Sequence, residues 1–220
     1  MPGNGRGILL VVDGPEGAGK STQVARIGSL LEGRIEHLEL REPGGTALGD
    51  RIRAILLDPA TRMTARAEAA LFMASRAELV SEVVRPALAR GAVVTLDRFF
   101  LSTYAYQIYG RGLPADEVRA ANALAVDGLV PDLTILLQLP FEAGLRRADT
   151  RGGRDRIEVA GDEFHRKVEQ AFVTFATTAW RAKHPECGPI TSIDATGERA
   201  DVTDRIVRVL AARWPSVFIS

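Results

Sequence analysis

The sequence predicts an α/β protein with a parallel sheet of five strands that is flanked by helices on both faces. Five short apolar runs rich in Val, Ile and Leu recur along the 220 residues, and longer segments separate them. Continuous apolar runs, rather than alternating ones, are typical of strands buried on both faces. The predicted strands are Ile8–Val12, Ile35–Leu40, Ala92–Leu96, Leu133–Leu139 and Ile190–Ile193.

Segments with the spacing of amphipathic helices lie between these strands, so strand and helix alternate along the chain. One stretch breaks the pattern: Arg146–Glu158 is rich in arginine and contains two glycines, and we expect a loop outside the packed core. The length suits one sizeable core, so we expect a single domain over residues 1–220 with a flexible tail at 1–7. The predicted helices are Ser21–Leu31, Ala47–Leu57, Ala65–Arg90, Ala115–Val126, Phe141–Ala148, Asp162–Lys183 and Asp201–Trp214.

The composition limits the partners and the compartment. The 28 Lys and Arg residues equal the 28 Asp and Glu residues in number, which argues against a nucleic-acid or membrane-surface partner, because both are reached through a net positive field. Cys187 is the only cysteine, so neither an intrachain disulfide nor a CxxC redox pair can form. The chain has no run of 18 apolar residues and no signal-peptide core. We therefore expect a soluble, cytoplasmic protein.

The segment DGPEGAGKST, residues Asp13–Thr22, carries the spacing GxxxxGK[ST] directly after the first predicted strand. Its glycines lack a Cβ, so backbone N–H groups can converge on phosphate oxygens, and the next helix adds a favourable dipole. In this pattern Lys20 bridges the terminal phosphates and Ser21 ligates magnesium. A glycine turn that only caps a helix is the alternative, but the flanking strand and helix favour nucleoside-triphosphate binding. The predicted contacts are Gly14, Pro15, Glu16, Gly17, Ala18, Gly19, Lys20, Ser21 and Thr22.

Four further stretches point to one family. They are REPGGT at Arg41–Thr46, LFMASRAE at Leu71–Glu78, DRFFLSTYAYQ at Asp97–Gln107 and RGGRDRIE at Arg151–Glu158. With the glycine-rich motif, and in this order, they make a chain that resembles the thymidylate kinases, which phosphorylate dTMP to dTDP with ATP and Mg²⁺. The resemblance implies the P-loop nucleoside-monophosphate kinase fold, a mobile arginine-rich lid at about 149–159 and a homodimer.

The resemblance assigns Phe72 and Arg76 to the thymine base. The two residues are four apart in a predicted helix, so they share one face. In the family, the matching phenylalanine stacks on thymine and the matching arginine hydrogen-bonds a carbonyl of the base. Without the resemblance, a core phenylalanine and a solvated arginine would be the ordinary interpretation.

The stretch that begins at the end of the third strand is assigned to both phosphates and to the nucleoside. By resemblance, Asp97 positions magnesium through its waters and Arg98 lies between the donor and acceptor phosphates; a surface ion pair is the alternative. Thr103, Tyr106 and Gln107 have the spacing that points three side chains of a short helix into one cleft. The family reads thymine at Thr103 and excludes a ribose 2′-hydroxyl at Tyr106; a packed tyrosine and an exposed threonine are the alternative.

Two more residues follow from the resemblance. The family places a carboxylate at the position of Glu16 against the 3′-hydroxyl of the dTMP sugar, which explains an anion inside a phosphate-binding loop. Arg53 matches a residue that grips the dTMP phosphate and would otherwise be one more exposed helical arginine. We also expect a cis peptide bond before Pro43, in the tight bend that its following glycines form.

The lid supplies the remaining phosphate contacts. The variable P-loop positions contain no arginine, so the resemblance is to the bacterial type, which carries its catalytic arginine in the lid. We assign this role to Arg151, which completes a catalytic set with Lys20 and Arg98, and we expect Arg147 to contact ATP. Asp149 departs from the pattern, because close relatives often have an arginine there.

Two other functions stay open at this stage. Another nucleoside-monophosphate kinase, for cytidylate or guanylate, would share the P-loop and the fold. A P-loop ATPase module that drives a partner would hydrolyse ATP without an acceptor. A GTPase switch is disfavoured, because none of the three lysines follows an asparagine and the guanine-reading NKxD motif is therefore absent.

Overall fold

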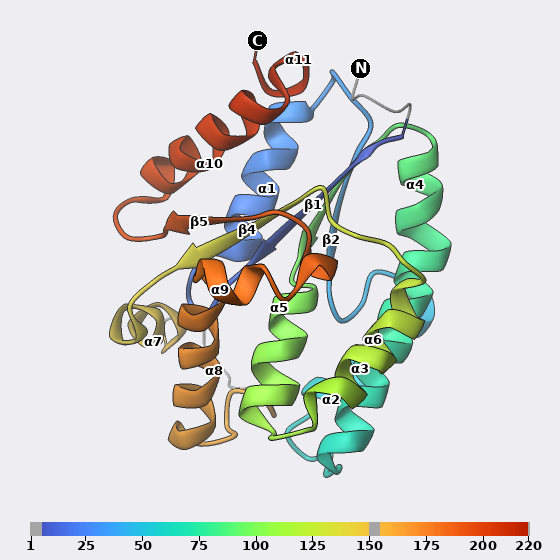
Figure 1. The fold of residues 1–220 in the computed structure, drawn as a ribbon, viewed down its shortest axis with the longest axis vertical. Helices are drawn as coiled ribbons and strands as arrows, with labels where there is room; N and C mark the ends of the chain where they lie inside the picture. Colours follow the sequence, from blue (N-terminus) through green and yellow to red (C-terminus); the bar gives the residue numbers. More distant parts are fainter. Residues whose placement is uncertain (1–5, 150–154, 220) are drawn as a thin grey trace.

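The computed structural model describes residues 6–149 and 155–219. Its centre is a five-stranded sheet in which all neighbours are parallel and the strand order is β2-β3-β1-β4-β5 (Figure 1). All five predicted strands are confirmed, with ends that differ by one or two residues. The strands are β1 (Ile8–Asp13), β2 (His37–Arg41), β3 (Val93–Asp97), β4 (Leu133–Gln138) and β5 (Ile190–Asp194).

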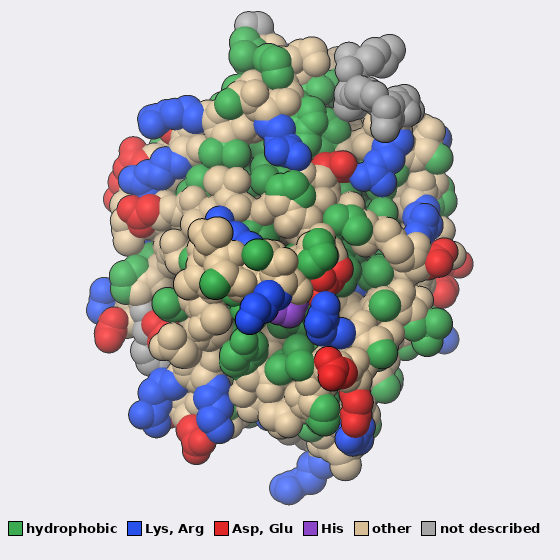
Figure 2. Space-filling model, in the orientation of Figure 1, with side chains coloured by type: hydrophobic (Ala, Val, Ile, Leu, Met, Phe, Trp, Pro, Cys, Tyr) green, Lys and Arg blue, Asp and Glu red, His purple; other side chains and the backbone are tan. Residues whose placement is uncertain are grey.

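Helices occupy most of the chain between the strands. They are α1 (Lys20–Leu31), α2 (Ala47–Leu57), α3 (Ala65–Leu79), α4 (Arg85–Ala89), α5 (Phe100–Thr103), α6 (Ala115–Val126), α7 (Phe141–Asp149), α8 (Asp162–Phe175), α9 (Thr178–Arg181), α10 (Arg199–Arg213) and α11 (Pro215–Phe218), with the π-helical turns η1 (Val80–Val84) and η2 (Tyr104–Gly110) and the 3-10 turn η3 (Pro185–Cys187). Within the described residues, no helix has both the length and the apolar character needed to cross a membrane. Figure 2 shows side chains of both charges scattered over one face, in keeping with the formal net charge of zero.

Both faces are buried at the centre of the sheet, because the side chains of β1, β3 and β4 alternate between two apolar layers. In β1, Leu9 and Val11 belong to one core cluster, whereas Ile8, Leu10 and Val12 belong to the other. The first cluster includes residues of α3, α6 and α8, and the second includes residues of α1, α10 and α11. Figure 1 shows α1 and α10 on one side of the sheet and α3, α4 and α6 on the other.

The predicted helix Ala65–Arg90 is interrupted in the structure. It ends as an α-helix at Leu79, widens into the π-helical turn η1 and resumes as α4. Pro86 explains the interruption, because it has no N–H to donate to the preceding turn. In the wider turn, the N–H of Arg85, the residue before the proline, donates a hydrogen bond to the Val80 carbonyl.

The predicted helix Asp162–Lys183 is two helices rather than one. The first, α8, ends at Phe175. Thr177 then caps a new helix, since its Oγ1 accepts a hydrogen bond from the Trp180 N–H at 3.3 Å. A threonine hydroxyl competes for backbone groups in this way, and the helical spacing of the apolar residues does not reveal it.

The arginine-rich stretch is only partly the external loop that the sequence predicts. Helix α7 continues through Arg146 and Arg147, and residues 150–154, with Arg151 and much of the predicted lid, lie outside the described residues. Arg156 is packed, with a side chain only 11% exposed, and its backbone N–H donates to the Leu57 carbonyl at 3.1 Å. The expectation of a loop outside the core is therefore wrong for Arg156.

Candidate functional site

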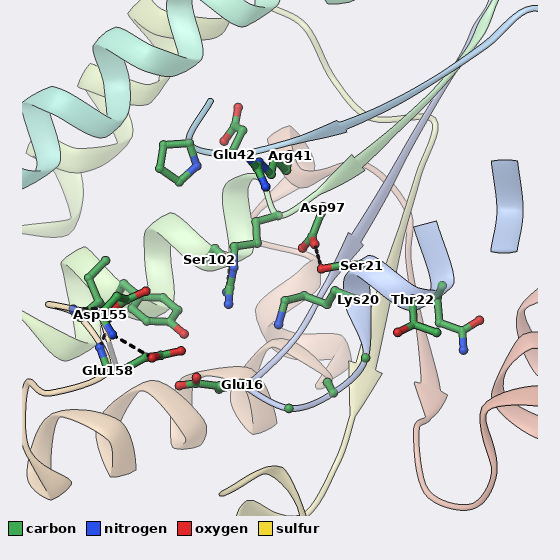
Figure 3. Close-up of a pocket in the computed structure, with 18 of the residues that line it drawn as sticks. Glu16, Lys20, Ser21, Thr22, Arg41, Glu42, Asp97, Ser102, Asp155 and Glu158 are labelled. Atoms are coloured by element: carbon green, nitrogen blue, oxygen red, sulfur yellow. Dashed lines mark hydrogen bonds between the residues drawn. The ribbon is translucent and has the colours of Figure 1, made fainter. Parts of the chain in front are cut away.

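A cavity of about 730 Å³ lies at the carboxyl ends of β1, β2 and β3 (Figure 3). Open α/β sheets place their ligands at this edge, and the volume suits a small-molecule site. Gly14 and Pro15 are not among the lining residues. The predicted site residues that line the cavity are Glu16, Gly17, Ala18, Gly19, Lys20, Ser21, Thr22, Arg53, Phe72, Arg76, Asp97, Arg98, Thr103, Tyr106, Gln107 and Arg147.

Three P-loop glycines have a positive φ, and two of them, Gly17 and Gly19, line the cavity. At Gly17, where φ is 72°, an added Cβ would lie 2.2 Å from the Gly144 carbonyl oxygen, so the loop can pack against α7 only without a side chain. Gly19 precedes α1 with a φ of 88°, and no atom lies within 4 Å of the position of its missing Cβ. The loop thus leaves open space beside the helix N-terminus, where an anion is favoured.

Lys20 is held beneath this loop. Its Nζ donates to the carbonyl oxygens of Gly14 at 3.0 Å and Pro15 at 2.7 Å. Burial, together with the nearby charge of Arg98, lowers the pKa of Lys20 to about 7. An anion bound in the cavity would favour the protonated amine, so Lys20 is suited to neutralise a phosphate.

Ser21 and Asp97 meet at the predicted metal position. The Ser21 hydroxyl donates to Asp97 Oδ2 at 2.5 Å, while Asp97 Oδ1 is buried and has no hydrogen-bond partner among the described residues. An orphaned carboxylate oxygen beside a hydroxyl fits the oxygen ligands that Mg²⁺ takes. In residues 6–149 and 155–219, no cluster of three or more His, Cys, Asp or Glu residues could hold a metal by itself. A cation here would therefore also need phosphate oxygens or water.

Two arginines, Arg41 and Arg53, lie in the wall opposite the P-loop, and Arg98 lies close to them. Arg53 Nη1 donates to the Pro43 carbonyl at 3.0 Å. The Glu42–Pro43 peptide bond is cis, as predicted. Burial lowers the pKa of Arg53, and the charges of Arg41 and Arg98 lower it further. Such repulsion is relieved by a bound anion, so this cluster is suited to a phosphate. Sequence reasoning did not single out Arg41, although it begins the REPGGT motif at the end of β2.

Arg98 has an unusual backbone, with φ at 74°, and its N–H donates to the Val12 carbonyl at 3.0 Å. Its guanidinium is held from two sides. Nη1 donates to Ser102 Oγ at 3.0 Å, and the guanidinium carbon lies 5.4 Å from the centre of the Tyr106 ring. The alternative interpretation, a surface ion pair with Asp97, is thus not the role of Arg98, which lines the cavity close to both Lys20 and Arg53.

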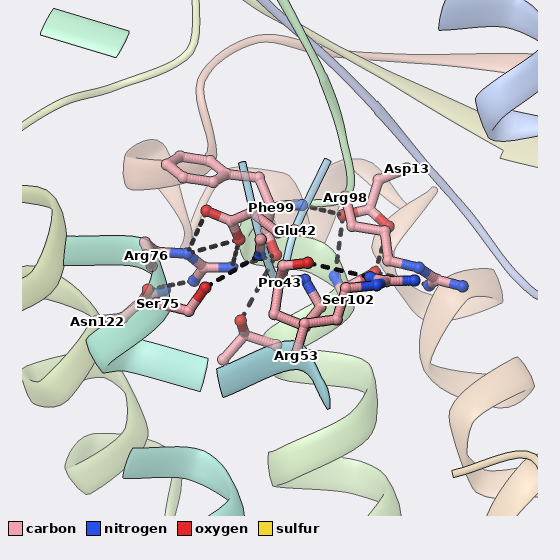
Figure 4. Close-up of polar contacts among 12 residues, drawn as sticks. Asp13, Glu42, Pro43, Arg53, Ser75, Arg76, Arg98, Phe99, Ser102 and Asn122 are labelled. Carbon is pink, nitrogen blue, oxygen red and sulfur yellow. Dashed lines mark hydrogen bonds and ion pairs between the residues drawn. The ribbon is translucent and has the colours of Figure 1, made fainter. Parts of the chain in front are cut away.

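Asp13 joins the P-loop to the segment that carries Arg98, and sequence reasoning missed it (Figure 4). Its Oδ1 accepts from the Gly14 N–H at 2.9 Å and the Ser102 hydroxyl at 2.7 Å. Its Oδ2 accepts from the N–H groups of Phe99 at 3.1 Å and Ser102 at 2.9 Å. Four hydrogen bonds satisfy this fully buried carboxylate. The sequence did contain a signal for Asp13, because an acidic residue directly follows the apolar run of β1.

Arg76 lies deeper than the sequence suggests and is 2% exposed. It forms an ion pair with Glu42, to which its Nε donates at 2.8 Å, and it also donates to Asn122 and to the Phe99 carbonyl (Figure 4). These contacts use four of its five N–H groups and leave one Nη1–H without a partner among the residues that the structure describes. The solvated arginine of the alternative interpretation is wrong, and Arg76 still lines the cavity next to Phe72.

The predicted triad on the helix after β3 is brought together. Thr103, Tyr106 and Gln107 all line the cavity, and all three are buried. The ring of Tyr106 meets Phe164 of α8 edge-on, with 6.0 Å between ring centres. The alternative of an exposed threonine is therefore wrong, and the spacing argument for a shared cleft is confirmed.

Arg147 reaches the opposite end of the cavity. Its Nη1 donates to the Ala195 carbonyl and its Nη2 to the Gly197 carbonyl, both at 3.2 Å. Gly197, Glu198 and Arg199, which follow β5, line the same end of the cavity. Helix α7 and the loop after β5 thus form one wall, separate from Arg41 and Arg53.

Glu68 of α3 is a buried anion beside the site, and it is 2% exposed. Its carboxylate accepts from Arg111 Nε at 3.0 Å and Nη2 at 2.9 Å, and from Gln107 Nε2 at 3.2 Å. It also forms an ion pair with Arg156 at 2.7 Å. Arg156, which the sequence assigned to a phosphate-binding loop, instead contacts Glu68 and donates to the Leu56 carbonyl at 2.8 Å.

These contacts make the contribution of Glu68 to stability dependent on pH. Burial alone would raise its pKa, but the hydrogen bonds and charges of Arg111 and Arg156 outweigh burial and lower it. A carboxylate with a lowered pKa stabilises the fold above its unfolded pKa, and this contribution is lost as the pH falls. We expect the difference in unfolding free energy between the wild type and Glu68→Gln to shrink below about pH 4.3, the ordinary pKa of glutamate. Urea denaturation across pH measures it, and a difference that stays constant would contradict the prediction.

Comparison with known proteins agrees with this geometry. The family model described as thymidylate kinase matches residues 12–184. A thymidylate kinase of Deinococcus radiodurans is 42% identical over 209 residues, which cover 94% of this chain and 98% of the relative. A thymidylate kinase of Carboxydothermus hydrogenoformans is 45% identical, covering 78% of this chain and 85% of the relative, and one of Pseudomonas fluorescens is 48% identical, covering 76% and 80%. The chain therefore belongs to the thymidylate kinase family.

Proposed function

We propose that the cavity transfers the γ-phosphate of ATP to dTMP, giving dTDP and ADP. Membership of the thymidylate kinase family supports this reaction. The observation that carries it here is that one cavity holds a P-loop lysine at one wall and Arg41 and Arg53 at another, with Arg98 close to both. Phosphoryl transfer depends mainly on aligning two anions and neutralising the charge between them, and this arrangement suits that task.

On the donor side, we propose that the P-loop backbone and Lys20 hold the ATP phosphates and that Arg147 lies beside the adenosine. Arg98 would bridge the two phosphates. Its hydrogen bond to Ser102 and its position between the two walls support this role. Arg151, for which the family resemblance is the only support, would complete the charge neutralisation from the lid.

On the acceptor side, we propose that Arg53, together with Arg41, holds the dTMP phosphate. Phe72 and the remaining Nη1–H of Arg76 would contact the thymine ring, in the deeper part of the cavity. Gln107 lies in the same wall and is available to the base.

Two residues would surround the sugar. Glu16, a P-loop carboxylate that lines the cavity, would accept a hydrogen bond from the 3′-hydroxyl. Tyr106, held between Arg98 and Phe164, would occupy the space of a ribose 2′-hydroxyl, and Thr103 would lie nearby against the base.

A coupled assay of ADP release tests the reaction and separates it from the two alternatives. We expect the highest kcat/KM with dTMP in a panel that also contains dUMP, dCMP, dGMP and a reaction without acceptor. A preference for another monophosphate would favour a different nucleoside-monophosphate kinase. ATP turnover that is equally fast without an acceptor would favour an ATPase module.

We further propose that Ser21 and Asp97 hold Mg²⁺ at the phosphates. Magnesium would supply a positive charge that bridges the phosphate oxygens. Because Asp97 Oδ1 has no partner among the described residues, it is free to bind a metal-bound water. We expect Asp97→Asn to raise the Mg²⁺ concentration for half-maximal rate by about tenfold or more, in the range typical of outer-shell ligands. A magnesium titration at saturating ATP and dTMP measures this shift, and an unchanged midpoint would count against the assignment.

A homodimer and a cytoplasmic location also remain proposals. The exposed side chains of Leu48 and Ile55 on α2, and of Leu124 on α6, give the chain apolar surface that a second copy could cover. Light scattering of the purified protein would decide the oligomeric state. Fractionation of cells would decide the location.

A further inference from the structure

Glu68 does not line the cavity, but it is hydrogen-bonded to Gln107, which does. It is a buried carboxylate on α3, and it touches two segments that are distant from it in the sequence: η2 and the residue after it, through Gln107 and Arg111, and the segment 155–158, through Arg156. Arg111 is itself fixed, since its guanidinium carbon lies 4.3 Å from the centre of the Phe164 ring. The Glu68 carboxylate is therefore held in one place.

The chemistry of this carboxylate determines how the Gln107 amide is turned. An ionised carboxylate has only acceptor atoms, so the amide must face it with its NH₂ group, as in the 3.2 Å contact from Nε2. If the amide turned over, its oxygen would oppose the carboxylate oxygen in a buried site, which is strongly unfavourable. The Gln107 oxygen accepts no hydrogen bond from the described residues, and Gln107 lines the cavity. The amide therefore offers a ligand its oxygen.

An acceptor at this position distinguishes between pyrimidines. Thymine and uracil have an N–H at ring position 3 next to the carbonyl at position 4. Cytosine has an unprotonated ring nitrogen there, next to an amino group. The oxygen of Gln107 complements the first pattern and repels the second, and the remaining N–H of Arg76 complements the carbonyl in the same way.

We propose that Glu68 is a positioning residue for substrate specificity, which locks the Gln107 amide with its oxygen toward the base and so favours thymine over cytosine. This proposal rests on the proposed function, because it takes the base to lie against Gln107. Glu68 itself does not touch the substrate. Its two arginines keep it ionised, and an ionised carboxylate leaves the amide no second orientation.

The test is the ratio of kcat/KM for dTMP to kcat/KM for dCMP in Glu68→Gln. A glutamine at position 68 can donate or accept, so the Gln107 amide would become free to turn. We expect the ratio to fall by about tenfold or more, which is the effect of losing one oriented hydrogen bond together with its repulsion of the wrong base. If Glu68 only balances the charges of the two arginines, both substrates would be affected alike and the ratio would not change.

Two further variants keep the test decisive. In a Gln107→Met background, Glu68→Gln should cause no additional fall in the ratio, because the amide is no longer present. If Glu68→Gln does not fold, the charge-balanced double variant Glu68→Gln with Arg156→Gln takes its place. In this double variant the ratio of kcat/KM for dTMP to that for dCMP should fall, whereas in Arg156→Gln alone it should stay at the wild-type value. An additive effect in the Gln107→Met background, or an unchanged ratio in the charge-balanced pair, would overturn the proposal.

The surface pair Arg66–Glu117 provides a matched control. Its side chains are 68% and 52% exposed, and Arg66 lies on the same helix as Glu68. Glu117→Gln should leave the ratio at the wild-type value. A wild type that does not phosphorylate dTMP would refute the proposed function, whereas a wild type that prefers dTMP while Glu68→Gln keeps the same preference would refute only the role of Glu68.

Discussion

Replacing Lys20 with methionine is expected to lower kcat for dTMP phosphorylation by about a thousandfold or more, the scale on which single positive charges act in phosphoryl transfer. Methionine keeps the length and packing of the side chain but removes its charge. Lys20 is buried under the P-loop, and a charge in such a site acts with little screening by water. The measurement is the rate of ADP release at saturating ATP and dTMP.

The same substitution should not weaken the fold. Because burial lowers the pKa of Lys20 to about 7, the protein keeps this amine at the expense of stability. An unfolded chain binds the proton more tightly than the folded one, so the wild type should gain stability as the pH rises through about 7 toward the ordinary lysine pKa of about 10.4. In Lys20→Met this gain should be absent, and the unfolding free energy near neutral pH should equal or exceed that of the wild type.

Lys167→Met is the control for Lys20→Met, because Lys167 does not line the cavity. Lys167 lies on α8 with a side chain 53% exposed, in an ion pair with Glu163 one turn away. Its removal should leave kcat unchanged and alter the stability by less than about 1 kcal/mol. If Lys20→Met retained more than about a tenth of the wild-type kcat, the lysine would not have the electrostatic role that its burial implies.

The features that were predicted correctly from the sequence are determined by short segments of the chain. A strand buried on both faces reads as a continuous apolar run, and the P-loop is a single short segment, so both are visible without knowledge of the fold. The shared cavity of Thr103, Tyr106 and Gln107 also follows from spacing along one helix. The family resemblance adds roles for Phe72 and Arg53, which spacing alone leaves undetermined; both residues line the cavity, and their roles stay predictions.

What it did not predict depends on contacts between distant segments. Asp13, Glu42 and Glu68 are all buried carboxylates, although a charged residue in a sequence is ordinarily expected at the surface. Each is satisfied by partners from other elements, such as Arg76 for Glu42, and only the topology brings these partners together. Arg156 was misread for the same reason: in sequence it belongs to an arginine cluster, but in the fold it contacts Glu68.

The largest effect on stability is expected from Arg76→Met, which should lower the free energy of unfolding by about 3–5 kcal/mol. The substitution leaves Glu42 as a buried carboxylate without its counter-charge and removes the donor to the Phe99 carbonyl. Burial already raises the pKa of Glu42, although Arg76 opposes this. Without the arginine, the pKa of Glu42 in the folded state should rise further, so the loss of stability relative to the wild type should grow as the pH rises above the already raised pKa that Glu42 has in the wild type.

Urea denaturation of three variants separates a buried charge from a lost contact. Arg66→Met removes an arginine from the exposed pair on the same helix and should change the stability by less than about 1 kcal/mol. Adding Glu42→Met to Arg76→Met should recover part of the loss, because removing both partners leaves no uncompensated charge. If Arg76→Met were no more costly than Arg66→Met, the ion pair with Glu42 would not stabilise this wall of the cavity, and the depth at which Arg76 lies would need another cause.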